Sequence, residues 1–217
     1  MGNCMEMSGK KSKKVGVMGG TFNPVHIGHL MLAEWTMEAA GLDEVLFIPA
    51  GCPYMKSQEE ILDGVKRLHM VELAIRSRDD FLCSDMEIRR NGYTYTYETL
   101  EQLKMENPDT EYYFIMGADC LFSLENWVHP ERILRACTLI AAARNGSPMS
   151  QLECKRRELE QRYHCSIRLL PFLSMEISSS DIRSRLKTGR SIRYLVPDPV
   201  FNYIAENKLY QEVNVRR

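Results

Sequence analysis

The chain has 217 residues, of which 44% are hydrophobic and 26% are charged, and this ordinary globular composition excludes a wholly disordered protein. Its formal net charge of −1 gives no overall basic field, so we expect neither nucleic acid nor a membrane surface as a partner. Seven cysteines without a C-x-x-C pair argue against a disulfide framework or a zinc knuckle, and predict mostly buried thiols in a cytoplasmic protein.

Residues 1–12 are polar and lack an apolar core, so we expect a flexible leader there and not a secretory signal. The remaining residues, 13–217, are expected to form a single domain, because a chain of this length buries enough surface to fold without disulfide or metal staples. No apolar run reaches the ~18 residues that a membrane-spanning helix needs.

Short apolar runs bounded by glycine, proline or polar residues predict strands over residues 15–18, 44–48, 81–88, 112–116, 138–143 and 167–170. Helical spacing predicts helices over residues 28–40, 61–75, 96–106, 131–136, 148–163 and 179–188, and a last one within 197–208. This alternation is typical of the α/β class, with a mostly parallel sheet, helices on both faces and a small C-terminal helical region at about 178–210. Loops at the carboxyl ends of such strands form the ligand site.

The loop after the first predicted strand carries the strongest chemical signal. Gly19 and Gly20 let the backbone approach a ligand closely, and the helix start that follows offers N–H groups to a phosphate. His26 and His29 flank Gly28 on one helical face, where each can donate a hydrogen bond to phosphate oxygens. Zinc would need a third ligand that the neighbouring sequence does not supply, so we predict no metal site in the protein. Capping or core histidines remain the alternative.

This loop resembles a known family. GGTFNPVHIGH, at residues 19–29, is similar to the GGTFDP-x-H-x-GH segment of bacterial nicotinate mononucleotide adenylyltransferases, with Asn23 in place of aspartate. Further segments resemble the family in the same order, at residues 91–100, 114–119, 143–146, 177–183 and 194–197. The resemblance covers residues 14–143 and 175–210, and little of 147–174. The family often has P-P-H-K after its second strand, whereas here Lys56 is present without the adjacent histidine.

The resemblance implies a Rossmann-like nucleotidyltransferase fold and a reaction of NAD biosynthesis. AMP would pass from ATP to nicotinate mononucleotide, with Mg²⁺ accompanying ATP, to give nicotinate adenine dinucleotide and pyrophosphate. Because the attacking phosphate is already an anion, no general base is needed, and catalysis reduces to positioning and charge stabilisation. The residues expected to carry it are His26, His29, Lys56 and Arg183.

The same resemblance assigns the two substrate sites. ATP is expected to contact Gly19, Gly20, Thr21, Phe22, Gly117, Asp119, Ser178, Ser179, Ser180 and Ile182. Nicotinate mononucleotide is expected to contact Asn23, Thr96, Tyr97, Trp127 and Val128, with the indole stacked on the pyridine ring. Helix capping is the alternative for the serines and Asp119, core packing is the alternative for Trp127, and Asn23 is also expected to shape its own loop.

Two other functions stay open at this point. One is an adenylyltransferase for pantetheine phosphate or nicotinamide mononucleotide, against which the 91–100 segment and Trp127 argue. The other is a nucleotide-binding regulator that has lost catalysis, which the presence of His26, His29 and Arg183 disfavours. The sequence leaves open whether the protein forms a homo-oligomer.

Overall fold

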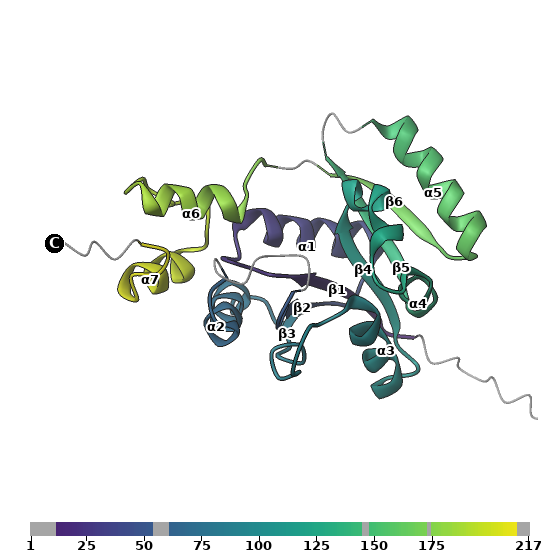
Figure 1. Ribbon diagram of the computed structural model, residues 1–217, viewed down its shortest axis with the longest axis horizontal. Coiled ribbons are helices and arrows are strands. Elements are labelled where there is room, and N and C mark those ends of the chain that lie inside the picture. Colours follow the sequence, from purple (N-terminus) through teal and green to yellow (C-terminus); the bar gives the residue numbers. More distant parts are fainter. Residues whose placement is uncertain (1–11, 54–60, 145–147, 173–174, 212–217) are drawn as a thin grey trace, which may run out of the picture.

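The computed structural model describes residues 12–53, 61–144, 148–172 and 175–211. A six-stranded sheet in the order β3-β2-β1-β4-β5-β6 forms its centre, and every strand pair is parallel (Figure 1). The strands are β1 (Lys14–Gly20), β2 (Glu44–Pro49), β3 (Phe81–Cys83), β4 (Glu111–Gly117), β5 (Thr138–Arg144) and β6 (Ile167–Phe172). The α/β class expected from the sequence is confirmed.

Helices follow the strands along the chain. They are α1 (Ile27–Ala40), α2 (Gly64–Ile75), α3 (Thr96–Glu106), α4 (Pro130–Ala136), α5 (Met149–Tyr163), α6 (Ser179–Lys187) and α7 (Asp198–Glu206). Two 3₁₀ turns that the sequence did not indicate, η2 (Ala118–Phe122) and η3 (Leu124–Asn126), come between β4 and α4. The C-terminal helices α6 and α7 lie together at one end of the molecule, and α5 lies at the other (Figure 1).

Each face of the sheet has its own hydrophobic core, because successive side chains of a strand point to opposite faces. Phe47 and Ile115 pack in one core with residues of α1, α2 and α7. Leu139 and Phe114 pack in the other with residues of α3, α4 and α5. The helices that follow β1 and β2 therefore cover one face, and those that follow β4 and β5 cover the other.

This arrangement fixes where a ligand can bind. The chain moves outward from β1 in one direction through β2 and β3, and then returns to β4 on the other side of β1. The loops after β1 and β4 leave toward opposite faces, so a crevice opens between them at the carboxyl ends of these two central strands. Ligands of open α/β sheets bind at such a switch point.

Two predicted boundaries need correction. The strand predicted over 81–88 ends at Cys83: the Ser84 N–H makes one more bond to the Phe47 carbonyl at 2.9 Å, and the chain then turns, with the Arg89 N–H bonding to the Asp85 carbonyl at 3.0 Å. The helix predicted from residue 61 begins at Gly64, since the Asp63 carboxylate caps it by accepting from the Val65 N–H at 2.9 Å.

The cysteines predicted to be mostly buried are mostly half-buried instead. All those in the described residues carry free thiols, and of these Cys154 is exposed. Burial raises the pKa of Cys83 and of Cys137 to about 12, so both remain protonated at neutral pH.

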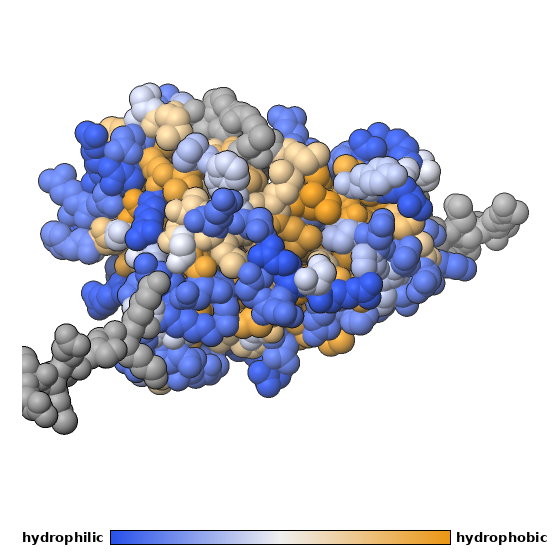
Figure 2. All heavy atoms as spheres, turned by 180° about the vertical axis from the view of Figure 1, so that it is seen from behind, coloured by the Kyte–Doolittle hydropathy of each residue, from blue (hydrophilic) through white to orange (hydrophobic). Residues whose placement is uncertain are grey.

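The face seen from behind is mostly hydrophilic, with apolar side chains showing in limited areas between charged ones (Figure 2). Among the residues that the structure describes, no helix combines the length and apolar character required to cross a bilayer.

The two-core arrangement predicts how strand substitutions affect stability. Leu139, on β5, is fully buried, so Leu139→Ala should lower the free energy of unfolding by about 2–5 kcal/mol. Leu82, on the edge strand β3, is 40% exposed, and Leu82→Ala should cost less than half as much, roughly 1 kcal/mol. Urea unfolding of both variants measures the difference, and equal losses would contradict the placement of the core.

Candidate active site

A cleft of about 630 Å³ opens at the carboxyl ends of β1 and β4. One wall is the loop between β1 and α1, another is the end of β4 with the turn that follows, and the third is the start of α6. The volume lies in the range of sites that hold small molecules and cofactors. The topology and the cleft therefore indicate the same place for ligand binding.

The two histidines of the first loop are brought together at the start of α1. Their rings stack with centroids 3.7 Å apart, and the Nδ1 atom of His29 accepts a hydrogen bond from the His26 main-chain N–H at 3.2 Å. An acceptor at Nδ1 places the proton of a neutral His29 on Nε2. His26 is buried, whereas His29 is only half-buried, so His29 is the more accessible of the two rings in the cleft.

Gly28 explains how the rings can lie so close to the helix. A Cβ atom added at this position would lie 3.1 Å from Nδ1 of His26, which is closer than most real contacts of a Cβ atom. The absence of a side chain at residue 28 therefore leaves room for the His26 ring. This is a packing reason for the glycine between the two histidines.

The start of α6 is fastened to the first loop. The Ser178 hydroxyl caps the helix by accepting from the Asp181 N–H at 3.1 Å, while the Ser179 hydroxyl donates to the Pro24 carbonyl at 2.8 Å. Arg183 donates from Nη1 to the Asn23 carbonyl at 3.0 Å. The first-turn N–H groups of α6 have no carbonyl within the helix to pair with, and the positive end of the helix dipole lies beside the cleft.

Asn23 is buried and organises this loop. Its side-chain oxygen accepts one hydrogen bond from the Tyr210 hydroxyl at 2.9 Å and another from the Leu62 N–H at 3.3 Å. A carboxylate could accept the same two bonds, which is a physical reason why asparagine and aspartate can both serve at this position. The C-terminal end of the described chain is thereby tied to the first loop.

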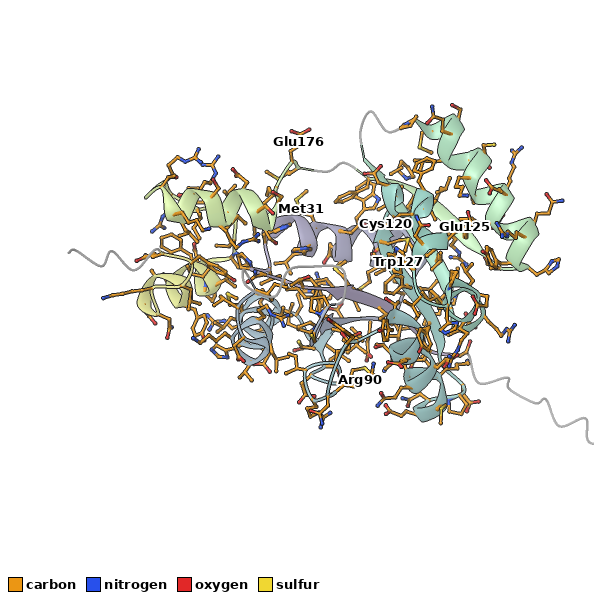
Figure 3. The ribbon with its side chains drawn as sticks, in the orientation of Figure 1. Met31, Arg90, Cys120, Glu125, Trp127 and Glu176 are labelled. Carbon is orange, nitrogen blue, oxygen red and sulfur yellow. The ribbon has the colours of Figure 1, made fainter. Side chains whose placement is uncertain are left out.

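The opposite wall carries an aromatic plate. Trp127 follows η3, lines the cleft and packs edge-to-face on Phe114 with ring centroids 6.2 Å apart. Figure 3 shows Trp127 and Cys120 near one another, with Glu125 toward α5. Lys155 of α5 donates to Glu125 at 2.6 Å and holds the pKa of that carboxyl below its usual range. Helix α5, where the family resemblance is weakest, therefore braces the turn that presents Trp127.

The remaining residues predicted for the mononucleotide lie next to this wall and do not line the cleft. Thr96 and Tyr97 are the first residues of α3, where main-chain N–H groups point out of the helix. The Tyr97 ring lies 5.0 Å from the His129 ring, edge-on, so the start of α3 and the segment after Trp127 are neighbours. Val128, which lies between Trp127 and His129 in the chain, is half-buried.

Most of the predicted site residues meet at the cleft. Those that line it are Gly19, Gly20, Thr21, Phe22, Asn23, His26, His29, Gly117, Trp127, Ser178, Ser179, Ser180 and Arg183. Asp119 is exposed on η2 outside the lining. Ile182 is fully buried in the hydrophobic core, and its main-chain N–H bonds to the Ser178 carbonyl, so the structure does not place it at the cleft surface. Lys56 lies outside the described residues.

Sequence reasoning missed two polar residues that hold the site together. Tyr210 carried no motif, and its bond to Asn23 joins residues 187 positions apart. Arg67 was interpreted only as part of an amphipathic helix, although it lies on the same buried stripe as Met70, Val71 and Ala74. An arginine in such a stripe is a detectable signal, because charged groups are rarely buried without specific partners.

Comparison with known proteins gives one family. The family model described as cytidylyltransferase-like matches residues 17–185. A relative from Lachnoclostridium phytofermentans, described as "Probable nicotinate-nucleotide adenylyltransferase", is 44% identical over 198 residues, which cover 91% of this chain and 99% of the relative. A relative of the same description from Dehalococcoides mccartyi is 43% identical over 203 residues, or 92% and 98% of the two chains.

Solved structures agree on the fold. The Plasmodium falciparum nicotinic acid mononucleotide adenylyltransferase complexed with NaAD superposes with a TM-score of 0.76 at 20% identity, over 91% of this chain and 97% of the other. The structure from Vibrio parahaemolyticus described as "a Putative Nicotinate-nucleotide Adenylyltransferase" has a TM-score of 0.63 at 23% identity, over 92% and 96%.

The Tyr210–Asn23 bond predicts a stability effect. Tyr210→Phe removes one buried hydrogen bond and should lower the free energy of unfolding at pH 7 by about 1 kcal/mol. Tyr194→Phe is the matched control, because Tyr194 is 79% exposed, and it should change little. Urea unfolding compares the two, and equal stabilities would show that the bond contributes nothing.

Tyr210→Phe should also change how stability depends on pH at high pH. Burial raises the pKa of Tyr210, so an unfolded chain ionises this hydroxyl near its ordinary pKa of about 10 while the folded chain does not. The contribution of Tyr210 to stability is therefore present below pH ~10 and lost as the pH rises above it. Tyr210→Phe should flatten that part of the decline.

Proposed function

This chain belongs to the nicotinate-nucleotide adenylyltransferase family, within the cytidylyltransferase-like proteins, and we propose that its cleft joins ATP to nicotinate mononucleotide. The products are nicotinate adenine dinucleotide and pyrophosphate, in a reaction of NAD biosynthesis. The observation that carries this function is the meeting of the glycine loop, the stacked histidines and the start of α6 at one cleft, in a chain 44% identical to a relative of that description.

The reaction depends on alignment of the two substrates more than on a general acid or a general base. A phosphate oxygen of nicotinate mononucleotide forms a bond to the α-phosphorus of ATP as the bond from that phosphorus to the bridging oxygen of pyrophosphate breaks. The attacking oxygen is already anionic, so no proton has to be removed from it. The protein must hold several negative charges close together in line and stabilise the charge that shifts to the leaving group.

The proposed phosphate-binding groups come from two elements that contact each other. His29 would donate from Nε2, and the first-turn N–H groups of α6, at Ser179 and Ser180, would add further donors and the helix dipole. Arg183 contributes a fixed positive charge on the same helix. Because Ser179 and Arg183 already bond to the loop that carries the histidines, these donors are held in a set geometry before ATP binds.

The mononucleotide would occupy the other wall. Trp127, braced by Phe114, offers a flat apolar face for a pyridine ring. The main-chain N–H groups at Thr96, Tyr97 and Val128 are the proposed donors to the nicotinate carboxylate, which only accepts hydrogen bonds. Asn23 would face this substrate from the β1–α1 loop.

A divalent cation is expected with ATP, and we propose Mg²⁺. Within the described residues there is no group of three or more histidine, cysteine or acidic side chains placed to hold a metal. Mg²⁺ does not require such a group, because it often keeps its waters and binds mainly through substrate phosphates. When bound, it would neutralise charge on the ATP phosphates, while His29, Arg183 and the α6 amides hold the nucleotide.

Pyrophosphate release with three candidate acceptors tests the function. We expect release with ATP, Mg²⁺ and nicotinate mononucleotide together, none in excess EDTA, and none with pantetheine phosphate. Nicotinamide mononucleotide should be used at least about 10²-fold less efficiently in kcat/KM, because its NH₂ group would face N–H donors at a cost of roughly 1–3 kcal/mol for each mispaired group. Failure of every pyridine mononucleotide as an acceptor would reject the assignment, and equal use of the two would reject the donor-only carboxylate site.

His29 is the residue whose loss should affect turnover most directly. If its Nε2–H stabilises charge that develops on ATP, His29→Ala should lower kcat on the order of 10²–10³-fold. His69→Ala is the control, because His69 is an exposed histidine of α2 that lies outside the cleft lining. Thermal midpoints measured in parallel separate the roles: a loss of activity that only follows a loss of stability would make His29 a packing residue.

A further inference from the structure

Arg67 is the most deeply buried charged residue that the described structure contains. It lies on α2, has only 1% of its surface exposed and does not line the cleft. Burial lowers the pKa of its guanidinium, but an arginine starts so high that the group stays protonated at neutral pH. A buried cation is costly unless each of its N–H donors has a well-placed acceptor.

Those partners are main-chain carbonyl oxygens of three segments. Nε donates to Leu62 at 2.8 Å, just before the helix that carries Arg67. Nη1 donates to Thr21 at 2.8 Å, and Nη2 donates to Ala50 at 2.6 Å and to Gly51 at 3.1 Å. The planar guanidinium is therefore used as a rigid spacer between the loop after β1 and the loop after β2.

The position of these carbonyls explains why a spacer is needed. The β1–β2 ladder ends at the pair Gly20 and Pro49, and its last main-chain bond runs from the Ala50 N–H to the Gly20 carbonyl at 2.8 Å. Beyond that point the two loops separate, and strand pairing no longer sets the distance between them. Arg67 bridges the two loops immediately after the last pair.

The β1 loop transmits this spacing to the cleft. Thr21 precedes Phe22, whose backbone has a left-handed φ of 48° and whose ring packs edge-on against His29 with centroids 5.0 Å apart. A shift of Thr21 would therefore move Phe22 and the His29 ring that rests on it. Arg67 itself contacts only main-chain carbonyls, and its effect reaches His29 through the Phe22 ring.

Resting on the proposed function, we propose that Arg67 is a positioning residue for adenylyl transfer: it fixes the separation of the β1 and β2 loops and so aligns His29 with the ATP phosphates. Its effect should fall on turnover more than on stacking of the pyridine ring, because Trp127 stands on the turn after β4, which Arg67 does not contact. A misplacement of about 1 Å can cost ~10²-fold in rate.

Two substitutions test the proposal by steady-state kinetics. Arg67→Lys keeps the charge but loses the planar fork, and Arg67→Met keeps the length but loses every donor. For Arg67→Lys we expect kcat to fall about 10- to 100-fold while KM for nicotinate mononucleotide stays within about threefold. Arg67→Met should lose at least as much, and the lysine variant keeps the test valid if the methionine variant fails to fold.

The control is Arg78→Lys. Arg78 follows the same helix, and its guanidinium bonds to the carboxylate of Asp80 at 2.9 Å and not to either loop. The Arg78→Lys substitution should leave kcat unchanged. Hydrogen exchange of Arg67→Lys should quicken in peptides that cover residues 19–23 and 50–53, and not in those that cover α5.

The outcomes separate the two proposals. If the wild-type chain releases no pyrophosphate with nicotinate mononucleotide, the proposed function fails. If the wild-type chain is active and Arg67→Lys retains its kcat per folded molecule, the positioning role is overturned. A lower thermal midpoint with unchanged kcat overturns it as well, because that result describes a structural arginine only.

Discussion

The loop between β1 and α1 must satisfy its main-chain carbonyl groups without a neighbouring strand, and the rest of the site depends on how it does so. Three donors from distant parts of the chain meet this need: Arg67 bonds to Thr21, Arg183 to Asn23, and Ser179 to Pro24. Buried carbonyls left unpaired are costly. The same contacts that stabilise the loop also determine where its histidines and glycines stand, so stability and catalytic geometry have a common origin here.

Because of the sheet topology, the two walls of the cleft are supported by different contacts. Because the chain leaves β1 toward one face and β4 toward the other, the polar loop and the aromatic wall have separate supports. The β1 side is held by hydrogen bonds to main-chain atoms, whereas Trp127 is held by ring packing and by the ion pair of Glu125 with Lys155. The proposed phosphate site, which needs fixed donors, and the proposed ring site, which needs a flat apolar surface, thus rest on different interactions.

Much of this architecture could be predicted from the sequence because it is local. Apolar runs located the strands, the capping alternative for the serines holds for Ser178 at the start of α6, and the glycine–histidine loop indicated the cleft. The contacts that could not be predicted join residues far apart in the chain. Arg67 is buried in a helix that the sequence predicted from its spacing alone, because the carbonyl groups that accept its hydrogen bonds lie in loops that helical spacing cannot reveal. The strand over 81–88 was predicted too long, because no glycine or proline marks the turn that begins at Asp85.

The hydrogen bonds that complete the loop after β1 join residues that are synthesised at very different times. Pro24 and Ser179 are 155 residues apart, Asn23 and Arg183 are 160 apart, and Asn23 and Tyr210 are 187 apart. A ribosome makes the loop near the beginning of synthesis and its last donors near the end, so the nascent chain carries an unfinished cleft through most of translation. Contacts of such separation form late, after loop closure has been offset by the core. The proposed nucleotide site is thus expected to be completed last, when Ser179, Arg183 and Tyr210 reach the loop after β1.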